Sequence, residues 1–132
     1  MCIRDSYFGA QTESDGLELW KYTGTGVPTM VANINTRTSH PIGSDPGYFV
    51  VFNNELYFRA DDGINGSELW KYDGVNAPTM VANINPGSVN SYPTNLTLFN
   101  GGIVFSADDG THGMELWQYT LPNAIPTLTF MG

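Results

Sequence analysis

The tripeptide Glu-Leu-Trp occurs three times in this chain of 132 residues, and this repetition limits the possible fold more than any other feature. The copies lie 50 and then 47 residues apart, and each is followed two residues later by a tyrosine. The motif residues are Glu18, Leu19, Trp20, Glu68, Leu69, Trp70, Glu115, Leu116 and Trp117. A motif that returns at nearly constant spacing indicates tandem copies of one structural unit.

Two further segments recur in phase with this motif. Residues 28–35 read Pro-Thr-Met-Val-Ala-Asn-Ile-Asn and return unchanged at 78–85, with a degenerate copy at 126–130. The other segment occurs at 52–60, 99–107 and, in part, 7–10. The repeat copies therefore span approximately residues 7–47, 48–95 and 96–132.

Residues 1–6 have no counterpart in the repeats. We expect this segment to be a non-native or disordered leader outside a single repeat domain at 7–132. The leader contains Cys2, which is the only cysteine of the chain. The repeat domain is therefore expected to contain no disulfide.

Each unit is predicted to form four short strands, because runs of aromatic and β-branched residues alternate with Gly, Pro, Asn and Asp. In the central copy we expect strands at 48–52, 55–60, 67–72 and 79–84. The pairs Asn53-Asn54 and Asn100-Gly101 favour tight hairpins, since Asn and Gly tolerate the positive φ that such turns require. Almost no helix is expected, because Gly or Pro interrupts every candidate stretch.

Four antiparallel strands per repeat are typical of a propeller blade. The predicted fold is all-β, with about two and a half to three β-propeller-like blades that form a fragment of a larger propeller. We expect about eleven strands, ordered as one remnant strand, two complete units and two trailing strands. Propellers close with about 4 to 8 blades, so the partners expected are further blades of the same protein or other copies of the chain. The alternative folds are a stacked sandwich and a β-solenoid.

The charge excludes two classes of partner. Thirteen acidic residues against five basic ones give a formal charge of −8. Without a basic patch, nucleic acid and anionic membrane surfaces are not expected partners. No apolar run reaches the ~20 residues of a membrane-spanning helix.

Two acidic, glycine-rich loops are the candidate metal sites. Clustered carboxylates in such loops can surround Ca²⁺ with oxygen ligands. The candidate ligands are Asp61, Asp62, Asp108 and Asp109. The alternative is that these aspartates form the hairpin turns and accept hydrogen bonds from local backbone amides.

The recurring Glu18, Glu68 and Glu115 are interpreted as structural. A catalytic pair of carboxyl groups needs unequal environments, whereas these three residues occupy equivalent repeat positions. We expect them to accept amide hydrogen bonds in each unit. The motif tryptophans are expected to pack between blades, with sugar stacking as the alternative. His40 and His112 have no partner histidine at metal-binding spacing and are expected to be solvated.

The motif resembles that of a bacterial repeat family named after Glu-Leu-Trp-x-x-Asp-Gly-Thr. The resemblance covers nearly the whole chain from Tyr7, and includes the turn at 85–87 and the Phe-x-Ala-x-Asp-Gly pattern at 105–110. Only the central copy keeps the Asp-Gly pair, as Asp73-Gly74. The resemblance implies a propeller-like protein that is extracellular or at the bacterial cell surface, with no established catalytic activity.

The leading functional hypothesis is a non-catalytic repeat or scaffold module of an exported bacterial protein, which binds carbohydrate, protein or a surface. No catalytic residue and no cofactor other than calcium is predicted. One alternative is a fragment of a propeller hydrolase or lyase. The other is a structural scaffold stabilised by calcium.

Overall fold

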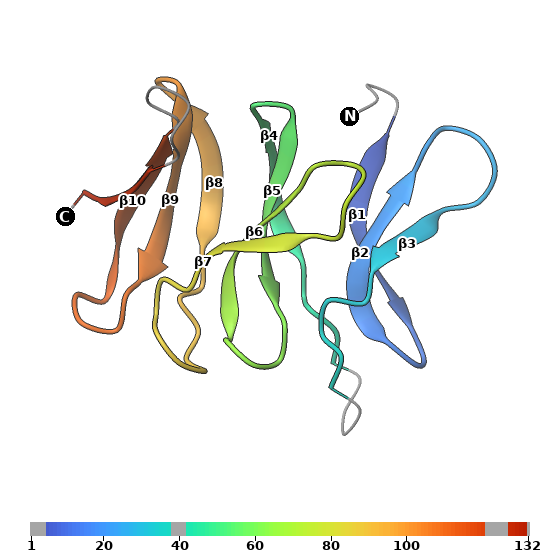
Figure 1. Ribbon diagram of the computed structural model, residues 1–132, viewed down its shortest axis with the longest axis horizontal. Helices are drawn as coiled ribbons and strands as arrows, with labels where there is room; N and C mark the ends of the chain where they lie inside the picture. Colours follow the sequence, from blue (N-terminus) through green and yellow to red (C-terminus); the bar gives the residue numbers. More distant parts are fainter. Residues whose placement is uncertain (1–4, 38–41, 121–126, 132) are drawn as a thin grey trace.

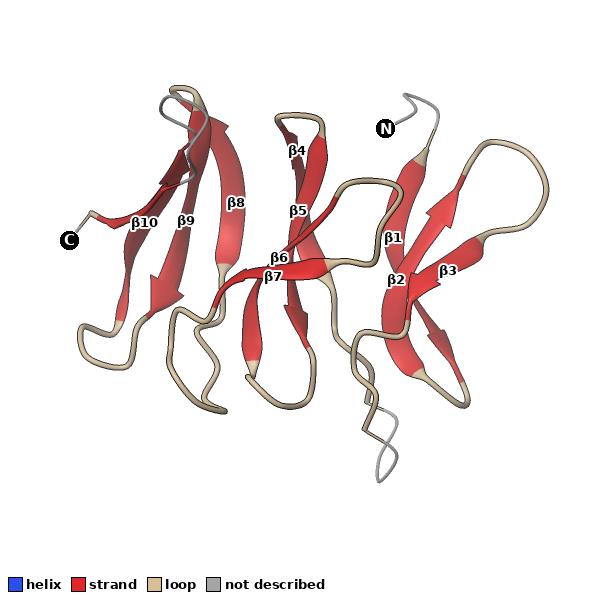
Figure 2. Ribbon diagram, in the orientation of Figure 1, coloured by secondary structure: helices blue, strands red, loops and turns tan. Residues whose placement is uncertain are grey.

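The computed structural model describes residues 5–37, 42–120 and 127–131. These residues form eleven β-strands and no helix, as Figure 2 shows, so the all-β prediction is confirmed. Within the same residues, no helix has the length and apolar character needed to cross a membrane.

The strands form three antiparallel sheets that lie side by side (Figure 1). The first sheet contains β1 (Ser6–Thr12), β2 (Gly16–Tyr22) and β3 (Thr29–Ala32). The second contains β4 (Gly47–Phe52), β5 (Glu55–Asp61), β6 (Ser67–Tyr72) and β7 (Thr79–Ala82). The third contains β8 (Thr94–Phe99), β9 (Gly102–Asp108), β10 (Met114–Thr120) and β11 (Thr127–Phe130). Strands adjacent in sequence are adjacent in each sheet, since the connections within a sheet are short.

The predicted number of strands is confirmed, and the four strands predicted for the central copy form the second sheet. The predicted grouping of the other strands is wrong. The sheets contain three, four and four strands, rather than one remnant strand, two complete units and two trailing strands. Each Glu-Leu-Trp strand pairs with the strand that follows it, so the chain changes sheets at the connections 33–46 and 83–93. The three sheets form no closed ring within the described residues.

Two predicted hairpins are confirmed by their backbone conformation. Asn53 and Asn54 have φ of 50° and 62°, and join β4 to β5. Asn100 and Gly101 have φ of 49° and 78°, and join β8 to β9. These positive φ values match the right-handed twist of the paired strands.

The last strand of the second sheet is shorter than predicted. It ends at Ala82 rather than at residue 84, and its register shifts opposite Leu69 and Trp70. The backbone amides of Ile84 and Asn85 donate to a glutamate side chain instead of continuing the sheet. The strand therefore ends where a side chain becomes the better hydrogen-bond partner.

Every sheet has two chemically different faces. Phe58 lies opposite Trp70 across β5 and β6, whereas Arg59 lies opposite Leu69. Because cross-strand partners share a face, we call the face that carries the motif tryptophan the Trp face and the other the Leu face. The Trp-face residues are Phe8, Ala10, Trp20 and Tyr22 in the first sheet, Phe58, Ala60, Trp70 and Tyr72 in the second, and Phe105, Ala107, Trp117 and Tyr119 in the third.

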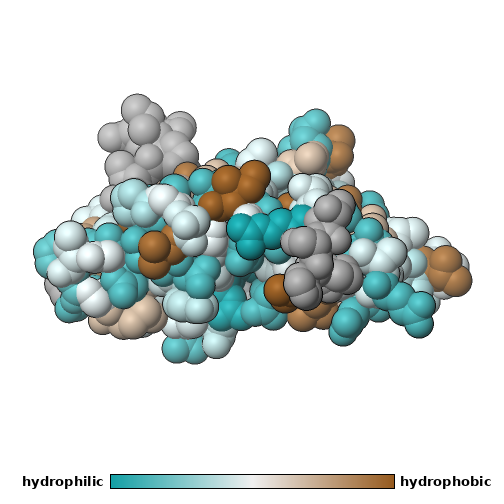
Figure 3. Space-filling view, turned by 90° about the horizontal axis from the view of Figure 1, so that it is seen from below, coloured by the Kyte–Doolittle hydropathy of each residue, from teal (hydrophilic) through white to brown (hydrophobic). Residues whose placement is uncertain are grey.

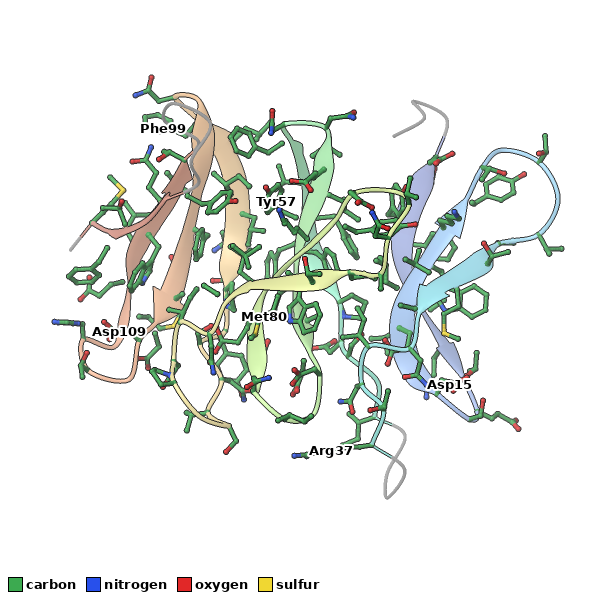
Figure 4. The ribbon with its side chains drawn as sticks, in the orientation of Figure 1. Asp15, Arg37, Tyr57, Met80, Phe99 and Asp109 are labelled. Atoms are coloured by element: carbon green, nitrogen blue, oxygen red, sulfur yellow. The ribbon has the colours of Figure 1, made fainter. Side chains whose placement is uncertain are left out.

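Two hydrophobic cores hold the sheets together, and both join a Leu face to a Trp face. Leu19 of the first sheet is buried with Phe58, Ala60, Trp70 and Tyr72 of the second. Tyr57 and Leu69 of the second sheet are buried with Phe105, Ala107 and Tyr119 of the third. The rings of Tyr57, which is labelled in Figure 4, and Tyr119 have their centroids 5.3 Å apart between these sheets. The second sheet is therefore covered on both faces.

Candidate functional site

The first two motif glutamates are buried hydrogen-bond acceptors. Glu68 is 0% exposed, and its Oε2 accepts the Ser91 hydroxyl at 2.6 Å and the Ile84 amide at 2.8 Å. Its Oε1 faces the Asn85 amide at 3.4 Å. The hydrogen bonds from backbone amides that were expected for these glutamates are thus present. A serine hydroxyl, which was not predicted, is a further donor.

The same arrangement occurs one repeat earlier. Glu18 is also 0% exposed and accepts the Ser44 hydroxyl at 2.6 Å. The amides of Ile34 and Asn35 donate to it at 3.0 and 3.2 Å. We call each pair, Glu18 with Ser44 and Glu68 with Ser91, a Glu-Ser latch.

The latch serines also connect successive sheets through their backbones. The Ser44 amide donates to the Leu17 carbonyl at 2.8 Å, and its carbonyl accepts the Asp61 amide at 2.8 Å. The Ser91 amide donates to the Ser67 carbonyl at 3.0 Å, and its carbonyl accepts the Asp108 amide at 2.9 Å. Each serine therefore bonds to the preceding sheet and, at Asp61 or Asp108, to the following one.

Burial raises the pKa of both latched glutamates above the ordinary value of 4.5. Hydrogen bonds from the serine and the two backbone amides oppose this increase but do not cancel it. The folded protein therefore binds a proton at Glu18 and Glu68 more readily than the unfolded chain does.

This pKa increase predicts that lowering the pH from 7 to 5 stabilises the fold. A raised folded-state pKa gives stability that is fully present below the unfolded value and is lost as the pH rises through the folded value. The carboxyls with lowered pKa, Asp62, Asp73 and Asp109, affect stability only below their ordinary value of 3.8, outside this window. Urea denaturation at both pH values measures the change.

The matched variant for this pH dependence is the double substitution Glu18→Gln and Glu68→Gln. Glutamine does not titrate. Between pH 7 and 5, the unfolding free energy of the double variant should therefore change less than that of the parent protein. Equal changes in the two proteins would mean that the latched glutamates do not cause the pH dependence.

The third motif glutamate is not latched. Glu115 is half-buried, and among the described residues it forms no hydrogen bond through its side chain. The adjoining Leu116 is 42% exposed, whereas Leu19 and Leu69 are 0% exposed. Equivalent sequence positions therefore have different environments.

The predicted calcium loops are organised by backbone hydrogen bonds. The Asp62 carboxylate accepts the amides of Ile64 and Asn65 at 2.8 and 2.7 Å, and Asp61 accepts the Gly63 amide at 2.6 Å. Asp108 and Asp109 repeat this pattern in the third sheet. Within the described residues no group of three metal-binding side chains occurs, and calcium binding stays a prediction.

His112 contacts the second of these loops. Its Nδ1 lies 2.7 Å from Asp109 Oδ2, and this hydrogen bond is the main cause that holds the pKa of Asp109 well below its usual value. The His112 ring stacks on Phe130 at 4.6 Å. His112 is exposed, whereas His40 lies outside the described residues.

A polar hollow of about 300 Å³ lies where the two inter-sheet connections meet. Leu17 and Ile42 add apolar lining. The polar lining comes from both connections, the end of β5 and the start of β6: Asn35, Arg37, Asp45, Asp61, Ser67, Asn90 and Tyr92. The hollow lies at the end of the molecule where Arg37 is labelled in Figure 4. Seen from below in Figure 3, this end is mainly hydrophilic, with separate hydrophobic patches.

Two residues of the hollow have groups available for a ligand. Tyr92 is 51% exposed and has a φ of 49°, an unusual conformation for an aromatic residue. Arg37 is exposed, and no ion pair in the described part of the chain involves its guanidinium group. Asp45, by contrast, is paired with Arg59 at 3.0 Å.

The latch serines and the hollow were not predicted from the sequence. A repeated Ser-x-Pro, at Ser44 to Pro46 and Ser91 to Pro93, was the available signal for the serines. No comparable signal marks the hollow, because its residues come from segments that are distant in sequence.

The chain matches no model of a known protein family, no curated protein and no solved structure.

Proposed function

We propose that this chain is a non-catalytic repeat module of an exported bacterial protein, and that it binds carbohydrate at the polar hollow. The observation that carries the proposal is the complete burial of Glu18 and Glu68 in the Glu-Ser latches. A general acid or base must reach a proton of the substrate. Carboxylates bonded to the main chain and closed to solvent instead support a structural role for the repeat motif.

The lining of the hollow favours carbohydrate as the ligand. Asn90 and Asp61 offer amide and carboxylate groups that can bond to sugar hydroxyls, and Arg37 adds N–H donors. The exposed ring of Tyr92 offers a flat apolar surface with a polar hydroxyl. A few polar groups around an aromatic side chain are typical of small-ligand sites.

The resemblance of the repeats to the bacterial Glu-Leu-Trp family supports export and an extracellular or cell-surface location. The stacking of three similar twisted sheets supports a propeller-like arrangement of the repeats.

The substitution Tyr92→Asn tests carbohydrate binding. Asparagine removes the ring but tolerates positive φ, so the connection should keep its shape. Loss of an aromatic contact of about 1–1.5 kcal/mol predicts roughly tenfold weaker binding. The parent is first screened on an array of neutral and uronic-acid oligosaccharides, and the affinity of each hit is then measured by titration calorimetry.

The matched control is Tyr48→Asn. Tyr48 is also an exposed tyrosine with positive φ, at 57°, but it lies outside the hollow. Its substitution should leave the affinity unchanged. Equal loss in both variants would contradict the hollow as the site, and an array without any hit would contradict carbohydrate as the ligand.

A further inference from the structure

The Leu face of the third sheet is open. Leu116 is 42% exposed, and Met114 and Phe99 on the same face are 51% and 60% exposed. The corresponding face of the second sheet is covered, since Leu69 is 0% exposed and Phe52 packs 6.4 Å from Tyr119. Phe99 lies at the end of the molecule opposite Arg37 and Asp109 (Figure 4).

The Trp face of the first sheet is open as well. Phe8, Ala10 and Tyr22 are only half-buried there. Their equivalents in the second sheet, Phe58, Ala60 and Tyr72, are 0%, 0% and 5% exposed because the first sheet covers them.

These two open faces are the two halves of one kind of interface. At both junctions inside the molecule, the Leu face of one sheet packs on the Trp face of the next. On the Leu face, Leu116 corresponds to Leu69, whereas Val104 stands where the second sheet has Tyr57. On the Trp face, Phe8, Trp20 and Tyr22 correspond to Phe58, Trp70 and Tyr72. Leu19 and Leu69 are each buried against the Trp face of the next sheet. The first sheet of another copy exposes a Trp face of the same kind, which can cover Leu116 in the same way.

We propose that a second copy of this chain docks head to tail, with its Trp face on the open Leu face of the third sheet. Such a contact joins two different surfaces, so repeating it gives either a ring or an open filament. Two copies contribute six sheets, which lies within the range of about 4 to 8 blades that close a propeller. The inferred assembly is a closed dimer in which both open faces of each copy are covered.

Repulsion between the copies does not prevent this contact. Each chain has a formal charge of −8, but the side chains argued to meet, Leu116 on one face and Phe8 and Tyr22 on the other, carry no charge. At physiological ionic strength, charges separated by more than about 8 Å are largely screened. The inference concerns the sheet faces and does not depend on a ligand in the hollow.

The mass in solution tests the proposal. Size-exclusion chromatography with light scattering, in physiological salt and over a series of protein concentrations, should give a species of twice the chain mass of 14.4 kDa. A mass of one chain at every concentration would overturn the proposal, and so would an open series of larger species.

Two substitutions test which faces meet. Leu116→Asp places a charge on the Leu face, and Tyr22→Asp places one on the Trp face, so each alone should reduce the mass to that of one chain. The control Val75→Asp, at a loop position that is 86% exposed, should stay dimeric. Circular dichroism establishes that all three variants keep their strands.

The Tyr22 variant excludes the other symmetric arrangement. If two Leu faces paired with each other, Leu116→Asp would dissociate the dimer but Tyr22→Asp would not. That result would overturn head-to-tail docking even if the parent is a dimer.

Discussion

Replacing Glu68 by alanine is expected to lower the free energy of unfolding by about 3 kcal/mol. The change leaves the amides of Ile84 and Asn85 without their acceptor inside the protein. The Ser91 hydroxyl loses its 2.6 Å bond to Glu68 and keeps only the Ser67 carbonyl, at 3.1 Å, as an acceptor. Each unsatisfied buried donor costs about 1–3 kcal/mol, and the loss is partly offset because a carboxylate no longer has to be desolvated. Urea denaturation followed by tryptophan fluorescence measures the change.

The chain contains its own control for this experiment. Glu115 occupies the same motif position, but its side chain forms no hydrogen bond within the described residues. Glu115→Ala should therefore change the unfolding free energy by less than about 0.5 kcal/mol. Similar losses at Glu68 and Glu115 would show that the latch is not the source of the stability.

A double-mutant cycle separates the hydroxyl from the two amides. Ser91→Ala alone should lower the stability by about 1.5–3 kcal/mol, since it removes one hydrogen bond to a charged group. Because Ser91 and Glu68 share that bond, the losses of the two single variants should sum to more than the loss of the double variant.

Replacing Leu69 by alanine is expected to lower the unfolding free energy by about 2–5 kcal/mol. Leu69 is 0% exposed and lies in the core between the second and third sheets. Alanine would leave a cavity there, because two packed sheets cannot easily collapse onto a missing side chain. Thermal or urea denaturation measures the loss.

Leu116→Ala is the matched control for this core. Leu116 has the same motif neighbours but is 42% exposed in the single chain. Its replacement should reduce stability by less than about 1 kcal/mol at protein concentrations where the chain is monomeric. A loss as large as that of Leu69 under those conditions would contradict the open Leu face.

The strands and hairpins could be predicted because their signals are local. Alternation of aromatic and β-branched residues favours strands, and the Asn53-Asn54 pair supplies the positive φ of a two-residue turn. Residues 67–72 form the strand that the sequence predicts. These features depend on contiguous residues, so a single sequence contains the necessary information.

The errors arise where a residue depends on distant parts of the chain. The strand predicted to reach residue 84 ends at Ala82 because Glu68, 16 residues away from Ile84, accepts the amides that follow. The four strands predicted for the central copy do form one sheet, but the grouping predicted for the other strands was wrong, since pattern alone does not tell which connection changes sheets. The third copy also differs from the second in the residue that faces the motif tryptophan. Phe130 lies opposite Trp117, whereas Met80 lies opposite Trp70.

By itself, the sequence determined the repeat, the all-β composition, the tight turns and the equivalence of the three Glu-Leu-Trp motifs. Only the tertiary structure decided what those equivalent residues do. Glu18 and Glu68 are latched by serines from the connections, and Leu69 is covered by the third sheet. Among the residues that the structure describes, Glu115 has no such serine, and Leu116 is 42% exposed. The physical reason is that burial and hydrogen-bond partners depend on which sheet lies next to a face, and identical motifs contain no information about their neighbours.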